Sequence, residues 1–146
     1  MTKFELDMDA MIKRIGLKAD TIMRKIALDL FLAVIIKTPV DSGMARGNWQ
    51  FSTGAPATAP ITRADQAGTT VVADVTNKIP GWDTKKSIFL SNSLPYIRTL
   101  EYGFFPTSPR KGEGKTIGGF SRQAPAGMVR ISVAKISGQL NRLIGA

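Results

Sequence analysis

One long amphipathic segment near the N-terminus constrains the fold of this chain more than any other feature. Within residues 4–37, apolar residues recur at alternating steps of four and three before a final step of four, at Met8, Ile12, Ile15, Ala19, Ile22, Ile26 and Leu30. This spacing places them on one face of an α-helix. Pro39 should end that helix, because its ring disfavours the helical conformation at the preceding residue and its nitrogen carries no proton. The apolar face of so long a helix must be covered by a sheet, a second helix or a neighbouring subunit.

Three shorter segments predict strands. Aromatic and polar residues alternate over 44–53, which is typical of a half-buried strand. The β-branched residues of 69–76 predict a second strand, and the apolar residues of 87–91 predict a third. Between the first two strands, residues 54–68 are rich in Pro, Ala and Thr and have little reason to pack. Together these segments predict a small, mainly antiparallel sheet of three to four strands.

Two further helices are expected in the C-terminal half. Pro95 should open a short helix that runs to about Tyr102 and is closed by Gly103. From Pro125 a last helix is predicted by four-three spacing, at Val129, Val133, Ile136, Leu140 and Leu143. We therefore expect one α+β domain over residues 1–146, in which the N-terminal and C-terminal helices pack on the sheet. Residues 54–68 and 104–123 would be its flexible segments, and 104–123 a long basic loop.

Composition excludes several classes of chemistry. The chain has no cysteine and no histidine, so disulfides, thiolate nucleophiles and Ser-His-Asp arrangements cannot form. The sequence Gly112-Glu113-Gly114-Lys115-Thr116 is similar to the end of a P-loop, but the first required glycine would fall at Pro109, which has no amide to offer a phosphate. We expect no catalytic, cofactor or metal site, and no enzyme. The longest apolar stretch, residues 26–36, is too short to cross a bilayer, so no membrane contact is expected.

The basic excess of the chain is concentrated near its C-terminus. The formal net charge is +9, and residues 84–146 hold ten Lys or Arg against two Asp or Glu. Such a field attracts polyanions or the acidic face of a partner protein. The loop 104–123 would then be a solvated loop, a surface that faces DNA, or a segment that orders against neighbouring proteins. Its candidate contact residues are Phe104, Phe105, Arg110, Lys111, Lys115 and Arg122, of which Arg110, Lys111 and Lys115 are the candidate DNA contacts.

Glu101 requires a specific partner. It lies at the end of the predicted short helix, where a negative charge opposes the helix dipole. Arg46 or Arg98 could compensate that charge, and we expect Arg46 and Glu101 to form a structural pair. A contact between subunits is the alternative.

Three short motifs occur in a fixed order along the chain. The first is Thr38-Pro39-Val40-Asp41-Ser42-Gly43 with Arg46 and Trp49, the second is Leu94-Pro95-Tyr96 with Leu100-Glu101-Tyr102-Gly103, and the third is Ala124-Pro125-Ala126-Gly127-Met128-Val129-Arg130. In this order they resemble the head-tail joining, or tail-completion, family of the neck of long-tailed double-stranded DNA phages. The resemblance spans most of the chain.

The resemblance implies a structural virion protein without catalytic activity. A member of this family would assemble in the cytoplasm of the bacterial host as a ring, commonly hexameric, at the head-proximal end of the tail. It would join the tail terminator to the head connector around the DNA channel, where basic residues could meet genomic DNA nonspecifically. Two alternatives remain open: a tail-terminator ring protein, and a sequence-nonspecific DNA-binding module.

Overall fold

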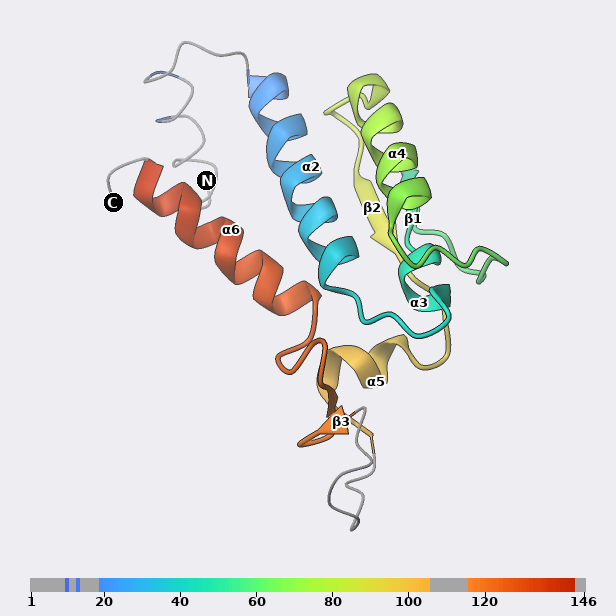
Figure 1. Cartoon of the computed structure of the whole chain (residues 1–146). Helices are drawn as coiled ribbons and strands as arrows, with labels where there is room; N and C mark the ends of the chain where they lie inside the picture. Colours follow the sequence, from blue (N-terminus) through green and yellow to red (C-terminus); the bar gives the residue numbers. More distant parts are fainter. Residues whose placement is uncertain (1–9, 11–12, 14–18, 106–115, 144–146) are drawn as a thin grey trace.

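The structure, a computed structural model, describes residues 10, 13, 19–105 and 116–143. Three long helices lie side by side, with α2 (Ala19–Lys37) in contact with both α4 (Thr69–Lys78) and α6 (Val129–Leu143) (Figure 1). Strands β1 (Gln50–Thr53) and β2 (Ile88–Ser91) form an antiparallel pair, and α4 packs against β1. The remaining elements are short: α3 (Met44–Gly47), the 3-10 turn η1 (Ile79–Gly81), α5 (Ile97–Tyr102), β3 (Thr116–Ile117) and β4 (Phe120–Ser121). The fold is α+β, as expected.

Helix α2 supplies the centre of the core. Its buried residues Phe31, Val34 and Ile35 form one cluster with apolar side chains from several other segments, namely Trp49, Val71, Val75, Ile79, Leu100 and Met128. Nearer its start, Ile22 is buried against Leu140 of α6. The helix ends at Lys37, just before Pro39, as predicted. Residues 4–18 of the predicted helix lie outside the described residues, except Ala10 and Lys13, which are helical.

The prediction of a strand at 69–76 is wrong, because this segment is helix α4. Val71, Val75 and Ile79 are each less than 3% exposed and lie four residues apart, so one helical face carries them into the core. The carboxylate of Asp65 accepts hydrogen bonds from the amides of Gly68 (3.0 Å) and Val71 (2.9 Å). Those bonds satisfy amides at the helix start that have no partner within the helix.

The predicted sheet of three to four strands does not form among the described residues. They contain two separate two-stranded pairs, β1 with β2 and β3 with β4. The predicted strand 44–53 is divided, because Gly43 has φ +90° and starts the helical turn α3, so only Gln50–Thr53 is extended. The predicted strand 87–91 is confirmed as β2, which pairs with β1 from Gln50 opposite Ser91 to Thr53 opposite Ile88.

Residues 54–68 pack more closely than expected. Asn48 Oδ1 accepts a hydrogen bond from the amide of Ile61 at 2.8 Å, and the guanidinium of Arg63 donates to the carbonyls of Gly47 and Trp49 at 2.6 and 2.8 Å. Asp65 is buried. The second half of this connection is thus tied to the α3–β1 region by side-chain hydrogen bonds that its composition does not reveal.

Helix α6 starts at Val129, four residues after the predicted opening at Pro125, and the face that is buried differs from the prediction. Met128 and Ser132 are fully buried, whereas Val129 and Val133 are 37% and 44% exposed. Ser132 tolerates burial because its hydroxyl donates to the Met128 carbonyl at 2.6 Å. The face that packs on the fold therefore lies one residue before the predicted apolar stripe, which leaves two valines on its flank.

Candidate functional site

The second and third motifs meet at the start of helix α6. Both carboxylate oxygens of Glu101 accept backbone amides there: Oε2 from Met128 at 2.7 Å and Val129 at 2.9 Å, and Oε1 from Arg130 at 2.9 Å. These amides belong to the first turn of the helix and have no acceptor within it. A negative charge at this end also complements the helix dipole. Glu101 of helix α5 thus caps helix α6.

Arg130 completes this contact. Its Nε donates to Glu101 Oε1 at 3.0 Å, and its Nη2 donates to the Glu101 carbonyl at 2.6 Å. Its guanidinium carbon also lies 4.8 Å from the ring centroid of Tyr102, a cation–π arrangement. Gly127 allows the close approach, because a Cβ atom there would lie 2.6 Å from the Glu101 carbonyl oxygen. Gly127, the amides that follow it and the Arg130 side chain, all in the third motif, therefore surround Glu101 of the second motif.

The charge of Glu101 is stabilised by this surrounding. Burial opposes its ionisation, but the hydrogen bonds from the amides of Arg130, Met128 and Val129 and from the Arg130 side chain outweigh burial, so its pKa is lowered. The expected pair of Arg46 with Glu101 is wrong. Glu101 does need a cation at its helix end, as predicted, but Arg130 is the cation that the α5–α6 packing brings into reach.

Arg46 has a different structural role. Its Nη1 donates to the Gln66 carbonyl at 2.7 Å, and its Nη2 donates to the carbonyls of Ile36 and Thr38 at 2.9 and 3.0 Å. The last carbonyls of a helix lack acceptor partners within it, so Arg46 satisfies the end of α2 and ties it to the segment before α4. Its Nε is buried without a hydrogen-bond partner.

The first motif is joined to the residue that precedes the third. The amide of Val40 donates to Gln123 Oε1, and Gln123 Nε2 donates to the Val40 carbonyl, both at 2.8 Å. At the head of the same motif, Thr38 is fully buried and its hydroxyl accepts the indole N–H of Trp49 at 2.8 Å. Side-chain hydrogen bonds therefore connect the second motif to the third, and the first motif to Gln123, which directly precedes the third, although 27 or more residues separate the bonded partners.

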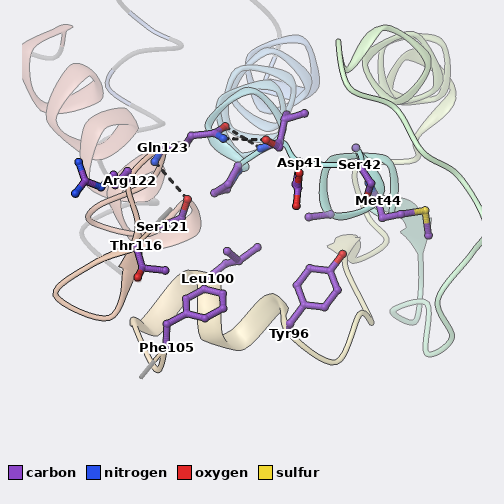
Figure 2. A pocket seen from close by; sticks show the side chains of 14 residues that line it. Asp41, Ser42, Met44, Tyr96, Leu100, Phe105, Thr116, Ser121, Arg122 and Gln123 are labelled. Atoms are coloured by element: carbon purple, nitrogen blue, oxygen red, sulfur yellow. Dashed lines mark hydrogen bonds between the residues drawn. The ribbon is translucent and has the colours of Figure 1, made fainter. Parts of the chain in front are cut away.

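A pocket of about 540 Å³ lies between the first motif, the second motif and the segment just before the third (Figure 2). We call it the turn pocket. The turn 39–45 forms one wall, Tyr96 and Leu100 of the α5 region form the second, and residues 121–123 form the third, with Phe105 and Thr116 beside them. The surface that lines the pocket is mostly apolar, although about half of the lining side chains are polar.

One side of the turn pocket carries a negative charge. The Tyr96 hydroxyl and the Asp41 carboxylate lie on this side, and the Arg122 guanidinium points away from the pocket (Figure 2). Burial raises the pKa of Tyr96, and the charge of Asp41 raises it further. The raised pKa keeps the Tyr96 phenol neutral beside Asp41.

The predicted contact residues fall into three groups. Phe104 is 65% exposed, in accord with a contact role, whereas Phe105 packs on the core and lines the turn pocket. Arg122 is exposed at the pocket rim. Arg110, Lys111 and Lys115 lie outside the described residues. The end of the predicted loop is ordered as the β3–β4 hairpin, to which the Phe105 amide is bound through the Gly119 carbonyl at 3.0 Å.

Sequence reasoning missed Arg130, Gln123 and Asp65, whose roles all depend on contacts between distant segments. Arg130 belongs to the third motif, and that position was a signal that it could pair with an acidic residue of another motif, such as Glu101. Gln123 and Asp65 gave no comparable signal.

The described residues offer no site of other kinds. They contain no cluster of three or more acidic side chains that could hold a metal ion. None of the helices in ranges 19–105 and 116–143 is long and apolar enough to span a membrane. Comparison of the chain with protein-family models, curated proteins and solved structures finds no match.

Proposed function

We propose that this chain is a structural subunit of a phage neck, which forms a ring at the head-proximal end of the tail and joins the tail terminator to the head connector. The observation that carries the proposal is the use made of the three motifs. The Glu101 side chain of the second motif accepts hydrogen bonds from backbone amides of the third, and the backbone of Val40 in the first motif bonds to the Gln123 side chain just before the third. Motif residues with this role define a scaffold, which is what the resemblance to the neck family implies.

The exposed side chains support a role in assembly. Large apolar groups remain accessible on several elements, at Ile36, Tyr96, Tyr102, Phe104, Ile117, Val129, Ile131 and Val133. Subunit contacts are built from such groups. Arg98, Arg122 and Lys135 are also exposed and have no acidic partner among the described residues, so they could serve a surface that faces DNA.

Localisation in the virion tests the proposal. An antibody against the chain, or an electron-microscopy map of a phage that encodes it, should place the chain between head and tail. The purified chain added to headless tails should bind at their head-proximal end and increase their mass by a fixed number of copies. Absence of the chain from that position in intact virions would overturn the proposed function.

The unpaired cations favour a second candidate, a sequence-nonspecific DNA-binding module. This reading predicts tight binding of free duplex, with log affinity falling by about 0.9 per phosphate contact for each tenfold rise in salt. A neck subunit alone should bind duplex weakly and lose it near physiological salt. Measuring affinity over a salt series therefore separates the two functions.

A further inference from the structure

Phe104 and Phe105 are adjacent in sequence but have different surroundings. Phe105 lines the turn pocket and packs on the core. Phe104 is 65% exposed and stacks on Tyr102, with ring centroids 5.8 Å apart and planes 28° from parallel. Phe104 therefore does not line the turn pocket of its own chain.

The partners of Phe104 hold it in place. The Tyr102 ring contacts both Phe104 and the guanidinium of Arg130, which is itself bound to Glu101. We call Phe104, Tyr102 and Arg130 the aromatic stack. The Arg130 side chain is 55% exposed and the Glu101 side chain only 9%, so the stack presents a cation to the outside. Rigid aromatic side chains beside an arginine are the groups that most often dominate the energy of protein interfaces.

The turn pocket has complementary properties. It is mostly apolar and carries the Asp41 carboxylate on one side, with Arg122 turned away (Figure 2). A cavity of about 150 Å³ can hold a benzene ring, so a pocket of about 540 Å³ has room for a phenylalanine side chain and part of its neighbours. The best fit is an aromatic group accompanied by a positive charge.

We propose that the turn pocket receives the aromatic stack of a second copy of this chain. Phe104 of one copy enters the pocket of the next, and its Arg130 faces Asp41 there. The stack and the pocket are different surfaces, so each copy can offer one and accept the other, and a head-to-tail contact of this kind closes into a ring when the rotation between copies allows it. The inference supplies the subunit contact of the ring and so rests on the proposed function.

Photo-crosslinking tests this contact. Phe104→p-benzoylphenylalanine keeps an aromatic ring at the stack, and the reactive group should couple to residues 39–45 or to Tyr96 and Leu100. Mixing isotope-labelled and unlabelled copies of the full chain at high concentration distinguishes coupling between chains from coupling within one. The matched control carries the same group at Thr76, an exposed position on α4. Coupling to the pocket between chains, well above this control, is the expected result.

A second measurement uses natural side chains. Phe104→Ala should raise the dissociation constant of self-association by about tenfold or more, because exposed aromatic anchors carry much of an interface's energy. Thr76→Ala, at the exposed position on α4 that serves as the crosslinking control, should change it little. Equal effects of the two substitutions would overturn the contact, as would coupling to any surface other than the pocket or coupling no stronger than the Thr76 control.

Failure of this contact and failure of the proposed function are distinguishable. A chain found at the neck of virions that couples elsewhere would refute the stack-in-pocket contact and leave the neck function standing. A chain absent from the neck that still couples to the pocket would refute the function and leave the contact.

Discussion

The cap that Glu101 provides to helix α6 can be tested by replacing one oxygen atom. Glu101→Gln keeps the size of the side chain but leaves one acceptor oxygen where the carboxylate has two. In the native chain each oxygen accepts two hydrogen bonds, Oε2 from Met128 and Val129 and Oε1 from the amide and Nε of Arg130. The amide group can satisfy only one of these pairs, and its NH₂ would face the donors of the other.

The expected cost follows from the groups left without an acceptor. A hydrogen bond to a charged group contributes about 1.5–3 kcal/mol. If the remaining oxygen keeps the amides of Met128 and Val129, the amide of Arg130 loses its acceptor, whereas the Arg130 side chain is half exposed and can turn to water. Glu101→Gln should therefore destabilise the chain by about 2–4 kcal/mol, which corresponds to a fall in Tm of roughly 5–15 °C for a chain of this size.

Urea denaturation measures this cost directly. Trp49 and Trp82 are each 5% exposed, so their fluorescence should report unfolding. Asp74→Asn is the matched control, because it makes the same change of atoms in an exposed pair with Lys78 and should cost less than about 1 kcal/mol. If the two variants lose equal stability, the carboxylate of Glu101 does not hold the start of α6 and the reasoning fails.

The same variant predicts a pH dependence. The pKa of Glu101 is lowered from its ordinary value of 4.5, so its stabilisation is complete above that value and is lost as the pH falls through the lower pKa of the folded state. The stability difference between the native chain and Glu101→Gln should therefore be constant near neutral pH and shrink in acid. A difference that grows in acid would contradict the lowered pKa.

Four other substitutions have definite expected outcomes, to be measured by thermal melts followed by circular dichroism. Gly127→Ala should cost about 2 kcal/mol or more, because Gly127 has φ +81° and an added Cβ would lie 2.6 Å from the Glu101 carbonyl oxygen. Gly138→Ala should instead stabilise by about 0.5–1 kcal/mol, since nothing lies within 4 Å of its Cβ position; equal melting temperatures for the two glycine variants would contradict this geometry. Asp65→Ala should cost about 1–2 kcal/mol through the lost α4 cap. Trp49→Phe should cost about 1 kcal/mol, because a buried threonine hydroxyl loses its indole donor, and an unchanged melting temperature in either variant would refute the corresponding bond.

The helical spacing of apolar residues predicted helices α2 and α6. Helix α4 was predicted as a strand, because strand propensity was given more weight than spacing. The β-branched residues of 69–76 favour a strand when taken one by one. Yet Val71, Val75 and Ile79 recur every four residues, and Asp65 stands ahead of them as an acceptor for the first amides. The spacing was visible in the sequence and outweighs propensity, because burial of one helical face contributes more than the intrinsic preference of single residues.

Glu101 shows that the sequence can indicate the need for an ion-pair partner without identifying that partner. The helix dipole argument correctly indicated that this carboxylate requires a cation, and in the sequence Arg46 and Arg98 could both supply it. The actual partner, Arg130, is 29 residues further along the chain and is placed by the packing of α6. Several arginines satisfy the electrostatic requirement equally well in sequence, so only the tertiary arrangement selects one. The turn pocket was unpredictable for the same reason, since its walls come from three separated segments.

Substitutions in the motifs and at Phe104 should have different effects on stability and on self-association. Both oxygens of Glu101 and the hydroxyl of Thr38 are occupied by bonds within the chain, so substitutions there should lower stability and self-association together. Phe104 is 65% exposed and adds little to the core, so Phe104→Ala should lower self-association while the free energy of unfolding stays nearly constant. Measuring both quantities on both kinds of variant distinguishes a scaffold motif from a contact residue. A loss of self-association in Phe104→Ala that merely followed a loss of stability would place Phe104 with the scaffold and remove it from the proposed interface.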